Sequence, residues 1–153
     1  MLLKGKKALI LGVANKRSIA WGIAAAFHRE GAELAFTYQS ERLKENLDEL
    51  LDSIGGRGSF PTYPLDVAVD DQLDAVFAHL GDRWGRLDAV AHCIAYADRD
   101  DLLTYVRAIN PLPSRVFIVH GEDRQAFSLA AAIRVEHPGL EVTVPDASTV
   151  YEL

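Results

Sequence analysis

The segment with the clearest capacity for chemistry is a glycine-containing turn between an apolar run and a helical pattern. Residues 8–11 are apolar, Gly12 follows them, and the helical pattern begins at Ser18. In a parallel α/β sheet, the helix after such a turn directs its free N–H groups and its positive dipole end toward a ligand, which suits phosphate. Gly12 lets a pyrophosphate approach the backbone, Ser18 can cap the helix, and Gly22 would allow close helix packing. Spacing alone leaves phosphate binding and a purely structural turn equally open.

The rest of the chain supplies a regular scaffold for this turn. Short apolar runs alternate with segments of helical period, which predicts a doubly wound, Rossmann-like α/β fold: a three-layer αβα sandwich within a single domain, 1–153. The right-handed crossover rule gives a parallel sheet of order 3-2-1-4-5-6. Strands are expected at 8–11, 32–37, 60–65, 87–94, 115–119 and 140–144, with 148–153 as a short edge strand. Helices are expected at 18–30, 41–54, 70–84, 100–109 and 123–136.

The composition of the chain argues against several kinds of binding partner and cellular location. The 153 residues are 49% hydrophobic and carry a net charge of −6, which disfavours a nucleic-acid partner because phosphate backbones need a cationic surface. Cys93 is the single cysteine, and no histidine or cysteine cluster is spaced to bind a metal. The N-terminus enters charged residues at once, so neither a signal peptide nor a membrane span is predicted. We expect a cytoplasmic protein without metal.

The first two-thirds of the chain resembles a known family. The text GKKALILGVANKRSIAWGIAAAFHREGAELAFTYQ, continued by LDVAVDDQLDAVFAHLGDRWGRLDAVAHCIAYA, strongly resembles the enoyl-acyl-carrier-protein reductases, a divergent branch of the short-chain dehydrogenase/reductases. The resemblance covers about 3–97, with the expected element order. It implies the NADH-binding half of such a reductase.

The resemblance implies a set of cofactor-binding residues at the ends of four strands. Asp66 would accept a hydrogen bond from the adenine amino group, while Gln39 by the adenosine ribose lacks the usual carboxylate and leaves the choice between NADH and NADPH open. Asp66 could instead cap the next helix, and Cys93 is best explained as a small buried hydrophobic residue. The full predicted set is Gly12, Val13, Ala14, Ser18, Ile19, Gln39, Asp66, Val67, Ile94 and Ala95.

The groups that perform catalysis in this family are not matched. These reductases use a tyrosine and a lysine placed beyond the fourth strand to support the developing enolate and to bind the ribose. Tyr96 and Tyr105 follow that strand, but Lys44 is the last lysine of the chain. We therefore predict that the chain is not an enzyme.

The last third has a different resemblance. From Ala97 onward the text resembles the C-terminal part of the β-CASP metallo-β-lactamase ribonucleases, at Ala97-Asp98, at 119–122 and at 151–153. The zinc ligands of that family are not present, and a lone His120 is more often structural than catalytic, by roughly four to one.

These observations give the predicted function. Two family fragments that meet near 95–98 suggest an engineered or recombined scaffold with no evolved catalytic activity and at most weak binding of NAD. The alternative is an NAD(H)-binding module derived from an enoyl reductase. We expect a monomer, with a dimer through an exposed edge strand as the other possibility.

Overall fold

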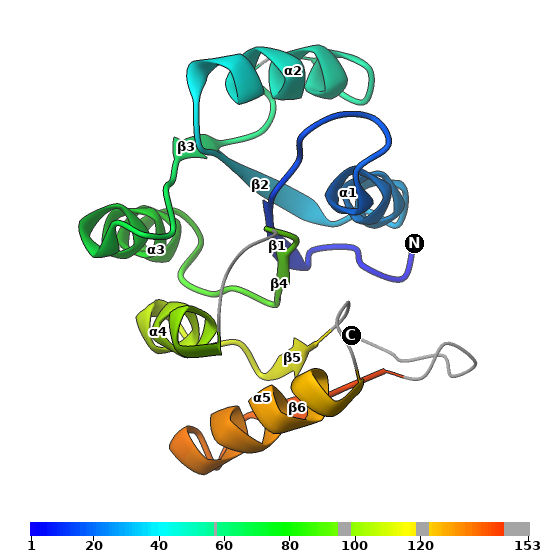
Figure 1. Ribbon diagram of the computed structural model, residues 1–153. Helices are drawn as coiled ribbons and strands as arrows, with labels where there is room; N and C mark the ends of the chain where they lie inside the picture. The colour runs from blue at the N-terminus through cyan, green and yellow to red at the C-terminus, as the bar shows by residue number, and fades with distance from the viewer. Residues whose placement is uncertain (57, 95–98, 119–122, 146–153) are drawn as a thin grey trace.

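The computed structural model describes residues 1–56, 58–94, 99–118 and 123–145, and its strands and helices alternate along the chain (Figure 1). This alternation confirms the predicted α/β class. The terminal strand expected at 148–153 lies outside the described residues. The strands are β1 (Lys7–Leu11), β2 (Glu33–Tyr38), β3 (Thr62–Pro64), β4 (Ala89–His92), β5 (Arg115–Phe117) and β6 (Glu141–Thr143). The helices are α1 (Ile19–Arg29), α2 (Glu41–Asp52), α3 (Asp70–Trp84), α4 (Arg99–Ala108) and α5 (Asp123–Glu136).

The first four strands form one parallel sheet of order β3-β2-β1-β4. The central strand β1 pairs on one side with β2, where Ile10 lies opposite Phe36, and on the other with β4, where Leu11 lies opposite His92. This arrangement confirms the predicted order 3-2-1-4. Because all four strands run in the same direction, their carboxyl ends lie at one edge of the sheet.

The outermost strand of this sheet is shorter than expected. The apolar run predicted a strand at 60–65, but β3 contains only three residues. Pro61 and Pro64 have no backbone N–H to give to a ladder, so this segment pairs only with β2 and stays at the edge.

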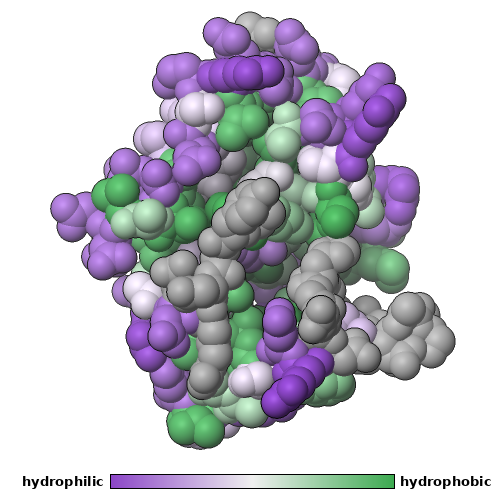
Figure 2. Space-filling view, in the orientation of Figure 1, coloured by the Kyte–Doolittle hydropathy of each residue, from purple (hydrophilic) through white to green (hydrophobic). Residues whose placement is uncertain are grey.

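Helices cover both faces of the four-stranded sheet. One cluster joins β1 and β2 to α1 and α2 through residues such as Ala24 and Leu47, which are fully buried. The opposite face packs against α3 and α4 through Phe77 and Tyr105, among others. This is the predicted three-layer sandwich. Hydrophilic side chains cover the end of the molecule where α2 lies, because only one face of that helix contributes to the core (Figure 2).

The last two strands depart from the predicted order. β5 and β6 pair in parallel with each other, but they form a second, two-stranded sheet, and no ladder joins β4 to β5 within the described residues. The continuous order 3-2-1-4-5-6 is therefore not observed. The side chains of this small sheet pack instead into a hydrophobic cluster of their own.

That third cluster is built only from residues between 103 and 144. Leu103 and Val106 of α4 pack there with Ala130 and Ile133 of α5 and with Val142 of β6. The same α4 supplies Tyr105 to the second cluster, and Ile109, directly after the helix, joins it there, so α4 divides its apolar residues between the two clusters. Whether the chain forms one domain stays a prediction.

No helix among the described residues is both long and apolar enough to cross a membrane.

Candidate dinucleotide site

The structure brings most of the predicted site residues to the carboxyl edge of the four-stranded sheet. Gly12 follows β1, Gln39 follows β2, Asp66 lies two residues after β3, and Ile94 lies two residues after β4. Ligands of doubly wound sheets bind at this edge, where loops and helix N-termini converge. Ala95 lies outside the described residues. The spatial grouping that the sequence implied is thus present for the residues that the structure describes.

The turn after β1 passes directly against the end of β4. Gly12 has a φ of +87°, and a Cβ placed on it would lie 2.5 Å from the carbonyl oxygen of Cys93 and 3.1 Å from the nitrogen of Ile94. A side chain is excluded there both by the backbone conformation and by this contact. Gly12 therefore lets two strand ends close up beside the place where a pyrophosphate would lie.

The N-terminus of α1 is left open to an anion. Ser18 occupies the N-cap position, but its side chain makes no capping hydrogen bond, which corrects the predicted cap. Its hydroxyl instead donates to the carbonyl oxygen of Asn15 at 2.7 Å, and the Asn15 side chain accepts from the N–H of Arg17 at 2.8 Å. The first turn of α1 contains no acidic residue. The N–H groups of this turn can donate to a phosphate, and the positive dipole end of the helix favours its charge, with no carboxylate in the turn to compete.

Two cations in the same loop add positive charge beside the N-terminus of α1. Lys16 and Arg17 are both exposed beside the start of α1. Neither cation is among the predicted site residues, although both lie between Gly12 and Ser18 in the sequence. Exposed cations raise the local concentration of an anionic ligand.

The loop is held in place mainly through its backbone. Val13 is buried in the first cluster, so it can offer a cofactor only main-chain groups. The carbonyl oxygen of Ala14 accepts a hydrogen bond from the Asn46 side chain of α2 at 3.2 Å. Asn46 lies 32 residues further along the chain, and no local sequence signal predicted this support.

The segment after β3 forms a compact turn around Asp66. The Asp66 carboxylate accepts from the N–H of Ala68 at 3.0 Å, and its own N–H donates to the Gln72 side chain of α3 at 2.8 Å. The carboxylate thus closes its own turn, while Val69 holds the N-cap position of α3. Val67 packs against the second cluster. A carboxylate has acceptor capacity beyond one bond, so Asp66 can still receive an amino group.

Three further predicted residues differ in what they can offer. Ile19 is 51% exposed at the start of α1, and Gln39 is exposed after β2, so both side chains are available to a ligand. Ile94 packs against the second cluster, which leaves its backbone as the accessible part.

The end of β4 is a poorly solvated place for titratable groups. Burial raises the pKa of the Cys93 thiol, which also packs against the first cluster, as expected for a small hydrophobic residue. Burial lowers the pKa of His92, so the imidazole is neutral near pH 7. Tyr105 is buried beside it, and burial raises the pKa of that phenol. Neither residue was among the predicted site residues.

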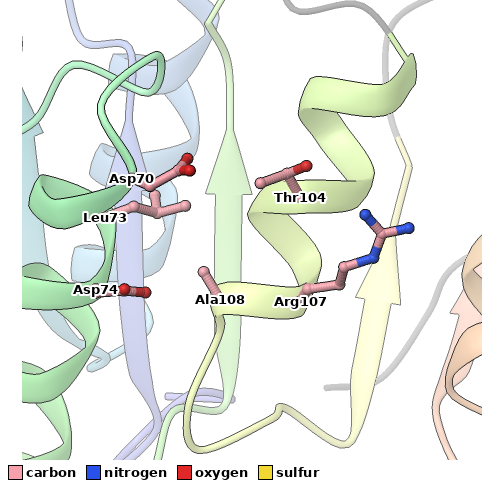
Figure 3. A pocket seen from close by; sticks show the side chains of 6 residues that line it. All are labelled: Asp70, Leu73, Asp74, Thr104, Arg107 and Ala108. Atoms are coloured by element: carbon pink, nitrogen blue, oxygen red, sulfur yellow. The ribbon is translucent and has the colours of Figure 1, made fainter.

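A groove between α3 and α4 is a separate feature. It has a volume of about 260 Å³ and is lined by Asp70, Leu73, Asp74, Thr104, Arg107 and Ala108. Figure 3 shows Arg107 directed away from the two aspartates, and its guanidinium instead makes two hydrogen bonds, of 2.6 and 2.7 Å, to Glu136. None of the predicted site residues lines this groove.

The positions that resemble the nuclease family, 97–98, 119–122 and 151–153, lie outside the described residues. His120 is one of them, so its role stays a prediction. Where the structure does describe the chain, no group of three histidine, cysteine, aspartate or glutamate side chains is placed to hold a metal ion.

Comparison with known proteins identifies the family. Residues 12–109 match the profile of the family described as "Enoyl-(Acyl carrier protein) reductase". This span is more than half of the chain, and the chain therefore belongs to that family. Residues 90–145 also match the profile of the "Zn-dependent metallo-hydrolase RNA specificity domain". The two matches overlap around the end of β4 and α4.

The curated relatives are reductases. The chain is 45% identical over 134 residues to an enoyl-[acyl-carrier-protein] reductase [NADH] of Bacillus cereus, covering 87% of this chain and 50% of that protein. It is 49% identical over 108 residues to the corresponding enzyme of Salmonella typhimurium, covering 70% and 40% respectively. The chain thus spans half or less of the length of these relatives.

Solved structures share the fold. A Bacillus cereus enoyl-acyl carrier protein reductase with NADP+ and indole naphthyridinone superposes with a TM-score of 0.73 at 31% identity, covering 92% of this chain and 71% of that one. The corresponding reductase of Anaplasma phagocytophilum with NAD gives a TM-score of 0.72 at 29% identity, covering 92% and 67%. The Rossmann-like fold is therefore confirmed.

These comparisons correct two predictions. A scaffold without evolved catalytic activity, and a chain that is not an enzyme, are both contradicted by relatives at 45–49% identity that carry the name of a reductase. The error has a definite source. The prediction relied on the absence of a lysine after Lys44, and an absence within a chain that spans about half of its relatives cannot exclude their activity.

We predict that Gly12→Ala destabilises the fold and the turn together. The added Cβ would require a positive φ and would meet the Cys93 carbonyl oxygen, so we expect a loss of about 1–4 kcal/mol in the free energy of unfolding. Gly22→Ala is the matched control. Contrary to the predicted close packing, Gly22 is exposed in α1 with nothing within 4 Å of its Cβ position, so alanine should stabilise by about 0.5–1 kcal/mol. Urea denaturation of both variants checks this. Equal effects would contradict the geometry.

We also predict an acid-dependent loss of stability centred on His92. Because burial holds its folded pKa below the ordinary 6.5, the unfolded chain takes up the proton first as the pH falls. The contribution of the neutral imidazole is therefore complete above pH 6.5 and is lost as the pH falls through the folded pKa. His92→Phe should flatten the dependence of unfolding free energy on pH in this window. The unaltered chain, measured over the same pH range, is the reference, and an equally steep dependence in both chains would contradict this prediction.

Proposed function

We propose that this chain binds NAD(H) at the carboxyl edge of its four-stranded sheet and serves the NADH-dependent reduction of an enoyl thioester. The observation that carries the proposal is the joint presence of the Gly12 turn and an uncapped, acid-free α1 N-terminus in a member of this reductase family. The names of the relatives support NADH as the cofactor. Nothing in the comparisons supports the predicted weakness of binding.

In this proposal the chain's residues bind and orient the cofactor. The N–H groups of the first turn of α1, with Lys16 and Arg17 beside them, would hold the pyrophosphate. Asp66 and Gln39 would lie along the adenosine half, and Ile94 with Ala95 would border the nicotinamide ribose. Bound NADH supplies the hydride. A neutral Gln39 leaves room for either NADH or NADPH, so the preference is to be measured.

The C-terminal third receives a separate proposal. The second profile match, over 90–145, and the third hydrophobic cluster, within 103–144, support a segment related to the RNA specificity domain, joined near 95–98. The absence of a nucleic-acid partner, the monomeric state and the cytoplasmic location stay predictions.

Binding can be tested by placing a charge at the start of α1. Ile19 is half exposed, so Ile19→Glu should leave the core intact while its carboxylate repels a pyrophosphate at the helix N-terminus. We expect NADH affinity, measured by calorimetric titration of the whole chain, to fall roughly tenfold, about 1.4 kcal/mol. Ile19→Gln, similar in size but neutral, should bind NADH like the unaltered chain.

Two outcomes would count against the proposal. If the unaltered chain releases no heat with NADH or NADPH, cofactor binding is excluded. If both Ile19 variants bind equally, the cofactor does not use this helix N-terminus. Consumption of NADH in the presence of an enoyl thioester tests the activity, and binding without turnover would contradict the reductase assignment.

A further inference from the structure

The contact between His92 and Tyr105 joins the end of β4 to α4. Their ring centroids are 4.8 Å apart at an interplanar angle of 76°, an edge-to-face arrangement. Phe77 of α3 contacts the Tyr105 ring from another side, with centroids 5.7 Å apart. Tyr105 is only 4% exposed. The Tyr105 ring is therefore held between β4 and α3.

The polar atoms of this pair are unusual. Within the described residues, three buried side-chain polar atoms have no hydrogen-bond partner, and two of them are His92 Nε2 and Tyr105 Oη. Buried polar groups are normally paired, because leaving them unsatisfied costs stability. Because neither atom makes a hydrogen bond, the ring contact is what joins these two side chains.

The position of His92 connects this contact to the proposed site. His92 lies opposite Leu11 in the ladder, and the next N–H, that of Cys93, donates to the Leu11 carbonyl oxygen at 3.2 Å. The carbonyl oxygen of Cys93 is the atom closest to the Cβ position of Gly12. A shift of His92 would therefore be passed through one residue to the turn at Gly12.

We propose that Tyr105 is a positioning residue: through its ring contact with His92 it fixes the end of β4 against the Gly12 turn and so shapes the nicotinamide side of the dinucleotide site. The effect on the cofactor rests on the proposed function, which supplies NAD(H) as the ligand. The coupling of α4 to the end of β4 is independent of that function. Both residues lie where the two matched spans overlap, so the contact also links the C-terminal unit to the cofactor edge.

The test compares three variants of the whole chain. Tyr105→Leu removes the ring, Tyr105→Phe keeps it, and Leu80→Ala removes a side chain of the same cluster that is 1% exposed, as a control for loss of packing. Amide hydrogen exchange of Cys93 and the dissociation constant for NADH are measured for each. We expect Tyr105→Leu to speed Cys93 exchange and weaken NADH binding several-fold beyond the control. Tyr105→Phe should restore both.

The outcomes separate this inference from the proposed function. If Tyr105→Leu and Leu80→Ala change both quantities equally, Tyr105 only packs and the inference is wrong. If Cys93 exchange responds but the unaltered chain does not bind NADH, the coupling holds and the proposed function fails. If exchange of Cys93 is unchanged in Tyr105→Leu, the coupling itself is overturned, whatever the affinity for NADH.

Discussion

The arrangement of the molecule depends on the burial of β1 on both sides and at both edges. Leu9, Ile10 and Leu11 have no exposed surface, and their side chains alternate between the two hydrophobic clusters that hold the helices. The strand also supplies both ladders that join β2 and β4 to the sheet. Gly12 can close against Cys93 only because β1 and β4 are held in this register. The geometry of the cofactor edge is thus a direct consequence of where β1 is fixed.

The second constraint is the shared helix α4. It faces the main sheet with Tyr105 and the small β5–β6 sheet with Leu103 and Val106. The small sheet needs no ladder to β4, because α4 and α5 complete its core. This packing explains how a chain with two family resemblances forms continuous structure across their overlap. The bidentate pair of Arg107 with Glu136 joins α4 to α5 on the exposed side of the same unit.

The sequence pattern predicted those features of the fold that depend on residues close together in the chain. The element order, the order of the first four strands and the glycine turn at Gly12 all follow from the alternation of apolar runs and helical periods. Contacts between distant segments were not predictable in this way. Asn46 supporting Ala14, Gln72 holding Asp66 and the separate β5–β6 sheet depend on tertiary packing that no window of sequence encodes. The wrong functional prediction came from treating a missing lysine as evidence about chemistry.

The measurement that tests the account most directly is a map of amide chemical shifts during titration of the labelled chain with NADH. The account predicts changes concentrated at Gly12, Ser18, Gln39, Asp66 and Ile94, with none at Lys7 and Asp88, which hydrogen-bond to each other at the opposite, amino edge of the sheet. Changes confined to the groove between α3 and α4, or spread evenly over the molecule, would contradict a dinucleotide site at the carboxyl edge.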